Sequence, residues 1–420
     1  MQQNRLSASQ IGLICAIAAC PVLMAIVPWD FGPDMTRSRY IVRSFSLTPT
    51  LIQLIVICIG MQNGLSIASA WRGLPQITQF ALPLLAALCM IPWFMGAEDP
   101  GRIPMAIIVF LVHIIFTLFL FELLSRFSEA QRAFLAKCIA SGVAAYCAVW
   151  AVSLFFYLPK DEGWVVLVPG VTNVRGLGFF VVAGFFMALA ALPENKATSF
   201  FSKNYVLPFL LAFIACLLGF WTGSRGSIFA IVVALGLLIL FAPRHWKPIL
   251  LCGGLVLALT ALVSLALPIP NPAYGIIRFA PPTGDGADVS SGRVAMWLEA
   301  IPKILERPIF GWGLDQFQLI QFASFRGYRQ PHNVVLQSLI STGFIGSALL
   351  AVAVLPVVRR ARLQTGSLVR ISALGMIATI CIFAMYDAAL YYNYPLMMLA
   401  VATALAFAPV RPQPARDRSG

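Results

Sequence analysis

The run IPMAIIVFLVHIIFTLFLFELL, residues 103–124, decides the fold class of this chain. As a helix it is long enough to cross a hydrocarbon core of about 30 Å. Similar apolar runs recur along all 420 residues, which are 60% hydrophobic and 11% charged, with a mean hydropathy of +0.86. Soluble domains are about half apolar and a quarter charged. The sequence therefore predicts an integral membrane protein built as an all-α transmembrane bundle.

The apolar runs predict about twelve membrane spans. Nine spans are expected within residues 1–268 and three within 333–410, with a large extracytoplasmic loop at 269–332 and a cytoplasmic tail at 411–420. The first run is taken as an uncleaved span because no small-residue cleavage site with a polar mature domain follows it. The predicted spans are residues 10–28, 47–69, 80–95, 103–124, 136–158, 177–193, 205–222, 227–242, 249–268, 333–356, 371–388 and 394–410.

The distribution of basic residues sets the orientation of the bundle. With the N-terminus inside, 16 of the 29 Lys and Arg residues lie in cytoplasmic segments, 7 lie in short outer loops and the remaining 6 lie in the long loop. This asymmetry agrees with the positive-inside rule. The net charge of +13 is thereby explained by topology, so no nucleic-acid partner is expected.

The long outer loop is the one soluble-looking segment in the sequence. It begins with a Pro/Gly-rich stretch around residues 281–286 that is expected to be irregular. An amphipathic helix is predicted at about 291–306, followed by a short one within 314–322. The longer helix is expected to lie flat on the outer surface and to roof a cavity between the spans. Its apolar stripe is Val294, Trp297, Leu298, Ile301 and Leu305, with Glu299 and Lys303 on the other side.

His332 is the first candidate for chemistry, because it lies at the outer start of the tenth span in Gln330-Pro-His-Asn333. The free N–H groups at a helix N-terminus favour anions. At about 100° per residue, Gly343 falls on the face of His332, where it would let a neighbouring helix approach. By itself, a histidine here is also compatible with a simple interfacial cap of the helix.

Three arginines are expected on the same side of the membrane as His332. Arg225 lies in a turn between two apolar runs, Arg175 lies just above the sixth span, and Arg293 begins the amphipathic helix. Each by itself is also compatible with a solvated or snorkelling surface residue. Together, several guanidiniums and one imidazole suit a diphosphate, because arginine pairs with phosphate oxygens through a planar fork of donors.

Asp387 has two interpretations from the sequence. It can orient an arginine, or it can belong to an aromatic belt with Tyr386, Tyr391, Tyr392 and Tyr394. The three histidines and the carboxylates show no metal-ligand spacing, so a metal-independent reaction and no cofactor are expected. The nine cysteines lie in or beside apolar runs without a C-x-x-C pair and are interpreted as packing residues.

Three motifs resemble the O-antigen ligase and O-antigen polymerase superfamily of bacterial membrane glycosyltransferases. They are His332-Asn333-x9-Gly343-x-x-Gly346, Ser291-Gly-Arg293-x-x-x-Trp297 with Arg307-Pro-x-x-Gly-x-Gly313, and Gly223-Ser-Arg-Gly226. The resemblance covers about residues 223–346, and before it the chain agrees in hydropathy and in Arg175.

The resemblance implies an inner-membrane enzyme whose active site faces the periplasm. The implied donor is a glycan on undecaprenyl diphosphate, and the implied acceptor is a sugar of lipid A-core for a ligase or a second lipid-linked glycan for a polymerase. It assigns catalytic roles to His332 and Arg225 by motif and to Arg175 by position. Arg293, Asn333 and Asp387 are expected to bind substrate. His332 is either the base or a diphosphate ligand. A transporter or flippase of lipid-linked oligosaccharides is the alternative from another class, but such proteins place polar groups near the midplane.

Overall fold

A computed structural model of the chain describes residues 6–26, 37–156, 174–193, 203–241, 248–268, 275, 290, 292–323, 330–361, 366–387 and 389–409. The described residues are helical and contain no strand. The elements are α1 (Ala8–Ile26), α2 (Arg37–Gln62), α3 (Ile67–Arg72), α4 (Gln76–Leu88), α5 (Ile91–Phe94), α6 (Arg102–Ser125), α7 (Glu129–Phe156), α8 (Val174–Ala190), α9 (Lys203–Trp221), α10 (Arg225–Phe241), the π-helix η2 (Ile249–Gly254), α12 (Leu255–Ala266), α13 (Arg293–Glu306), the 3-10 turn η4 (Phe317–Leu319), α14 (Val334–Ala361), α15 (Leu368–Ala384) and α16 (Asn393–Phe407).

The helices fall on the apolar runs seen in the sequence. Within the described residues, seven stretches are long and apolar enough to cross a membrane: Ala8–Ile26, Gln76–Phe94, Arg102–Ser125, Glu129–Val152, Asn204–Trp221, Ile249–Ala266 and Val334–Arg359. Five shorter apolar helices correspond to the other predicted runs. The all-α membrane bundle is therefore confirmed at this level, while the count of twelve spans stays a prediction.

Helix α8 lies at the centre of the bundle, and its residues from Gly176 to Ala190 are all buried. The Phe180 ring stacks between Tyr146 and Tyr394, at centroid distances of 4.2 and 4.3 Å. Gly184 lies so close to Val143 of α7 and Ala215 of α9 that an added Cβ would meet their side chains at 2.8 Å. Small residues of α8 thus lie where a neighbouring helix approaches closely, and its aromatic residues fill the space between helices.

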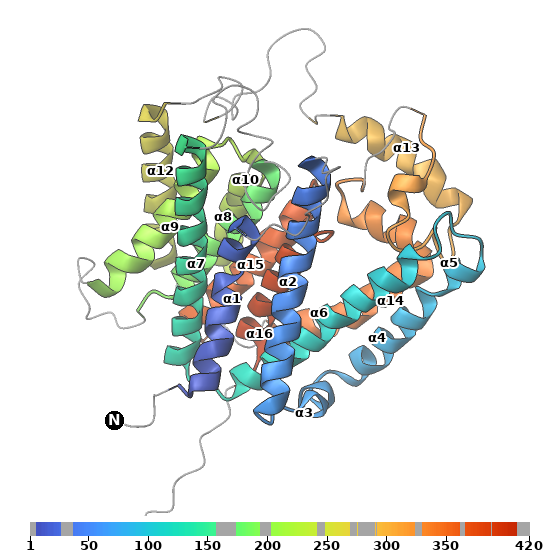
Figure 1. The fold of residues 1–420 in the computed structure, drawn as a ribbon, viewed down its shortest axis with the longest axis horizontal. Helices are drawn as coiled ribbons and strands as arrows, with labels where there is room; N and C mark the ends of the chain where they lie inside the picture. Colours follow the sequence, from blue (N-terminus) through green and yellow to red (C-terminus); the bar gives the residue numbers. More distant parts are fainter. Residues whose placement is uncertain are drawn as a thin grey trace, which may run out of the picture.

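A second, smaller core forms around α13, beside the main bundle (Figure 1). Met296, Ala300 and Ile304 of α13 pack with Phe317 and Ile340, which lies in the first half of α14. In Figure 1, α13 lies at the end of the molecule opposite α3, with α4, α5 and α14 on the same side of the bundle. Residues 292–323 and 330–342 thereby form a packed unit with its own apolar interior.

Helix α14 is broken at Gly343, which adopts φ 65° and ψ −170°. The segment Pro308–Gly313 fills the break: the Trp312 amide donates to the Ile340 carbonyl at 2.7 Å, and the Phe344 amide donates to the Pro308 carbonyl at 2.7 Å. The prediction that Gly343 continues the helical face of His332 and admits a neighbouring helix is therefore wrong. A broken helix does not keep the 100° step, and the close neighbour is an irregular segment.

The predicted amphipathic helix exists as α13, but its apolar stripe does not form the packing face. Val294, Leu298, Ile301 and Leu305 are 46–64% exposed, and the buried face consists of Met296, Ala300 and Ile304. The predicted second short helix is the 3-10 turn η4. The Pro/Gly-rich stretch at 281–286 and the tail at 411–420 lie outside the described residues. All nine cysteines are free thiols, and five of them are buried.

Candidate functional site

The turn between α15 and α16 presents a buried carboxylate, Asp387, which is 6% exposed. One oxygen, Oδ2, lies 3.2 Å from Nη2 of Arg293, and the other, Oδ1, lies 3.5 Å from Nδ1 of His332. Both partners are also largely buried, at 18% and 15% side-chain exposure. We call Asp387, Arg293 and His332 the Asp387 cluster. It decides between the two interpretations of Asp387 in favour of orienting an arginine.

His332 has a left-handed backbone conformation, with φ 54°. Such a conformation costs a non-glycine residue about 1–3 kcal/mol and persists where the surroundings impose it. Its Nδ1 atom forms no hydrogen bond, because the 3.5 Å separation from Asp387 is long for one. Hydrogen bonds of catalytic groups in ligand-free proteins are often long and tighten in the substrate complex.

Asn333 explains why the histidine lies where it does. Its Oδ1 accepts hydrogen bonds from the amides of Val335 at 3.0 Å and Leu336 at 3.1 Å, so it caps α14. Its Nδ2 donates to the carbonyl of Met385 at 3.0 Å, which joins the start of α14 to the turn that carries Asp387. Both functional groups of the amide are thus engaged with protein. We therefore expect Asn333 to position His332, whereas the sequence suggested that it binds substrate.

Trp297 and Gln330 are site residues that the sequence interpretation missed. The indole N–H of Trp297 donates to the carbonyl of Pro331 at 2.8 Å, immediately before His332. The amide of Gln330 donates to the hydroxyl of Tyr392 at 3.3 Å. The available signal for Trp297 was its spacing of four residues from Arg293, which places both side chains on one side of α13.

Arg225 is the first residue of α10, and this end of the helix lies beside the Asp387 turn. The Tyr386 hydroxyl donates to the carbonyl of Gly226 at 2.7 Å, and a Cβ at Gly226 would meet the ring of Phe383 at 2.8 Å. Burial and the adjacent Asp387 carboxylate raise the pKa of Tyr386, so its hydroxyl remains a donor at neutral pH. Within the part of the chain that the structure describes, the Arg225 guanidinium has no ion pair or hydrogen bond.

The start of α8 reaches the same region and carries the backbone of Arg175. Three residues later, Gly178 lies so close to Ser224 that an added Cβ would meet its hydroxyl at 2.8 Å. The Phe179 ring lies 5.2 Å from Phe383 and 6.1 Å from Tyr392, between centroids. The N-terminal ends of α8 and α10 thus flank the turn that holds Asp387. The starts of α8, α10 and α14 and the turn itself are distant in sequence and converge there.

The tyrosines near Asp387 form specific polar contacts within the protein, and whether they also form an aromatic belt stays a prediction. Tyr391 donates to Oδ1 of Asp315 at 2.6 Å, and Oδ2 of Asp315 lies 3.7 Å from Nη1 of Arg102. Tyr394 is fully buried. Asp285 and Asp288 of the long loop lie outside the described residues, and Lys303 pairs at 2.7 Å with Glu306.

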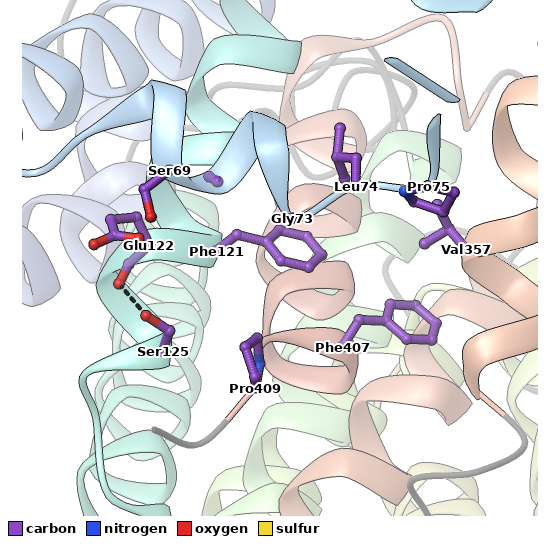
Figure 2. A pocket seen from close by; sticks show the side chains of 11 residues that line it. Ser69, Gly73, Leu74, Pro75, Phe121, Glu122, Ser125, Val357, Phe407 and Pro409 are labelled. Carbon is purple, nitrogen blue, oxygen red and sulfur yellow. Dashed lines mark hydrogen bonds between the residues drawn. The ribbon is translucent and has the colours of Figure 1, made fainter. Parts of the chain in front are cut away.

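A cavity of about 220 Å³ lies elsewhere, where the corner between α3 and α4 meets the C-terminal ends of α6 and α16 (Figure 2). Its wall includes Phe121, Phe407 and the buried Glu122, whose carboxylate is paired with Arg126 at 2.8 Å. None of the residues that line it belongs to the Asp387 cluster. Among the described residues no group of three His, Cys, Asp or Glu side chains is placed to hold a metal ion.

The site can bind an anion and hold a proton acceptor beside it. The guanidiniums favour negative charge. If the neutral imidazole of His332 carries its proton on Nδ1 toward Asp387, the lone pair of Nε2 is left to accept a proton. A buried carboxylate beside these groups limits their motion and balances their charge.

Comparison with known families finds a match for part of the chain. Residues 210–351 match the sequence model of a family described as O-Antigen ligase. The matched range runs from within α9 to α14 and includes Arg225, Arg293, His332 and Asn333, while Arg175 and Asp387 lie outside it. A search of curated proteins found no match. The predicted resemblance is confirmed over this range: residues 210–351 resemble the O-antigen ligase family, which supports a membrane enzyme of the ligase or polymerase type.

Proposed function

We propose that this protein is an O-antigen ligase-type glycosyltransferase that moves a glycan from undecaprenyl diphosphate onto a sugar of lipid A-core at the periplasmic face of the inner membrane. The observation that carries this proposal is the Asp387 cluster, in which one buried carboxylate holds both a guanidinium and an imidazole. A lipid diphosphate needs cationic ligands, and a sugar hydroxyl needs a base. The cluster supplies both kinds of group in one place.

In the proposed reaction the acceptor hydroxyl oxygen attacks the anomeric carbon of the donor glycan. The bond from that carbon to the phosphate oxygen breaks, and its electron pair leaves with the undecaprenyl diphosphate. The hydroxyl proton passes to Nε2 of His332. Arg175 and Arg225 at the starts of α8 and α10 are our candidates to stabilise the charge that grows on the diphosphate.

Asp387 has the role of a positioning group in this scheme. Its Oδ1 faces Nδ1 of His332, which favours the tautomer with a free Nε2, and it stabilises the imidazolium that forms when the proton arrives. Its Oδ2 fixes Arg293, which turns the guanidinium toward the same region. The alternative role of His332 as a diphosphate ligand uses the same geometry, but it needs a different atom to take up the hydroxyl proton.

The proposal is tested by alanine substitution of His332 and Arg225 in cells that lack the native protein. We expect loss of the surface polysaccharide at normal expression of either variant. Lys303→Ala is the matched control, because this residue lies on α13 and pairs with Glu306 away from the cluster. Unchanged polysaccharide in the His332 and Arg225 variants would contradict the proposal.

A polymerase that joins lipid-linked repeat units is the second candidate, because the Arg-Pro-x-x-Gly-x-Gly and His-Asn elements are common to both kinds of enzyme. A deletion strain distinguishes them. Core without any attached polymer indicates a ligase, whereas core with a single repeat indicates a polymerase. Flipping of a labelled lipid-linked glycan by the purified protein in vesicles, with no glycosidic bond formed, would indicate a transporter instead.

A further inference from the structure

The exposed half of α13 carries an apolar strip that the described residues leave uncovered. Val294 is 49% exposed, Leu298 64%, Ile301 46% and Leu305 63%. Their spacings of four, three and four residues place them on one line along the helix. They are not needed for packing, since Met296, Ala300 and Ile304 fill the interface with the rest of the segment.

A second strip beside the apolar strip carries two glutamates, Glu299 and Glu306, and we call it the polar strip. Ala295, Pro302 and Glu306 are exposed and Glu299 is partly exposed, and at 100° per residue they lie about 100° around the helix from the apolar strip. A helix surrounded by water would expose polar residues around this whole half, and one immersed in hydrocarbon would expose apolar ones. An exposed surface that is divided into an apolar strip and a charged strip is typical of a helix at a membrane–water interface.

The apolar strip is continuous with side chains of a membrane-crossing helix. Ile309 follows α13 and is 53% exposed, and Phe344 and Ile345 of α14 are 51% and 46% exposed. The Phe344 amide donates to the carbonyl of Pro308 at 2.7 Å, so these residues adjoin. Val334–Arg359 is long and apolar enough by composition to span a bilayer, and its part after Gly343 adjoins Ile309, so lipid around that part is within reach of α13.

Where this apolar surface ends, beyond Leu305, the protein has side chains suited to the lipid headgroup region. The Arg307 guanidinium lies over the Trp312 ring, 4.3 Å from its centroid, and donates to the carbonyl of Gly96 at 3.3 Å. Tryptophan and arginine are favoured at membrane interfaces, where one side of the residue is apolar and the other is wet. Arg293, at the opposite end of α13, points into the Asp387 cluster.

We propose that α13 is an interfacial membrane helix, seated on the side of the bilayer where the Asp387 cluster lies. Its apolar strip enters the acyl region, and its polar strip faces water. The ligand of this surface is the phospholipid leaflet itself. The seating holds Arg293 at the depth of lipid phosphates, and it does not depend on which reaction the protein catalyses.

The test compares the two strips in the full-length protein reconstituted into phospholipid vesicles. In a variant with the nine native cysteines replaced, single cysteines at Leu298 or Leu305, and at Ala295 or Glu306 as matched controls, receive a nitroxide label. We expect collisions with oxygen to dominate at Leu298 and Leu305, and collisions with a water-soluble nickel chelate to dominate at Ala295 and Glu306. A several-fold contrast in the ratio of the two collision rates supports the seating.

Equal nickel access at all four labelled positions would overturn the proposal. Dipolar broadening between labels at Leu298 in two copies of the chain would also overturn it, since a second copy would then cover the strip. As a measurement that keeps the native cysteines, benzophenone amino acids at Leu298 and Ala295 are irradiated in the same vesicles. Crosslinking to lipid at Leu298 alone is expected, and equal crosslinking at both sites would count against the seating.

Discussion

Asp387 is a buried carboxylate that contacts both Arg293 and His332. These two contacts determine how much stability a substitution at Asp387 costs. Removing one member of a buried ion pair leaves an uncompensated charge and commonly costs 3–5 kcal/mol. Arg293 and His332 come from a different part of the chain than Asp387, so the pair also joins two parts of the fold. Changes at Asp387 are therefore expected to affect both geometry and chemistry.

The first prediction concerns Asp387→Asn. The amide keeps the shape of the side chain, but it neither neutralises Arg293 nor stabilises an imidazolium at His332. Glycan transfer by the purified protein is expected to fall by about 10²-fold or more. Because the two residues act as a unit, the double variant with His332→Ala should be little worse than His332→Ala by itself. Additive losses of rate would contradict the proposed coupling.

Trp297 gives a second prediction at the same scale. Trp297→Phe keeps an aromatic ring but removes the donor to the Pro331 carbonyl, which helps to hold His332 at its positive φ. The expected result is a lower kcat with KM nearly unchanged. Trp312→Phe is the matched control, because it removes a hydrogen bond of the same 2.8 Å length to the carbonyl of Lys303.

Both tryptophan variants should lose about 1 kcal/mol of stability, whereas the loss of kcat is expected for Trp297→Phe only. An equal loss of kcat in the two variants would mean that Trp297 acts through general stability. Thermal unfolding of each purified variant in detergent, measured beside the transfer assay, separates the two effects.

At the scale of elements, α14 is two helices joined at Gly343. Loop residues 308–313 donate to and accept from the backbone on both sides of the break, through Trp312 to Ile340 and through Phe344 to Pro308. This arrangement holds the first half of α14, with His332 at its start, at an angle set by the loop. The Arg-Pro-x-x-Gly-x-Gly and His-Asn motifs are therefore parts of one local structure.

A third prediction follows for Gly343→Ala. A residue with a side chain strongly disfavours φ 65° with ψ −170°, and the added Cβ would collide with the backbone of Ile309. We expect a loss of about 1–3 kcal/mol in the free energy of unfolding, visible as a lower Tm. Gly236→Ala in α10 is the control, since its Cβ would meet nothing within 4 Å, and its Tm should be unchanged or higher.

At the scale of the whole molecule, the site lies where two packed parts meet. Arg293 and His332 belong to the segment with its own apolar core, whereas Asp387 and Tyr386 belong to a turn of the main bundle. Tyr386 binds the start of α10 and Asn333 binds the carbonyl of Met385, so the turn connects both parts. The proposed chemistry therefore depends on the docking of these parts.

The fourth prediction concerns metal ions. The proposed reaction uses guanidiniums for the diphosphate and His332 for the proton, so transfer by the purified, reconstituted protein should continue when a chelator is added. The measurement is the rate of glycan transfer with and without chelator, followed by Mg²⁺. Complete loss of activity that Mg²⁺ restores would contradict a metal-independent reaction.

The sequence by itself determined the helices and the membrane class. Each apolar run became a helix close to its predicted place, because hydrocarbon-length runs of apolar residues fold locally by hydrogen bonds within one segment. The motifs around Arg225, Arg293 and His332 also predicted the family whose sequence model matches residues 210–351, since they lie within that range. The helices, the membrane class and the motifs depend on residues that are close together in the chain, so they can be predicted from the sequence alone.

Only the tertiary structure decided which groups meet and which faces are covered. The partnership of Asp387 with Arg293 and His332 spans 94 residues in one case, and no local periodicity encodes such a contact. The Pro308–Gly313 segment packs into a break of α14 at Gly343, where the sequence predicted a continuous helix. Met296 and Ala300 form the packing face of α13, so most of its predicted apolar stripe is exposed. Periodicity identifies that a helix has an apolar face, but the neighbours that cover or expose it are fixed by long-range packing.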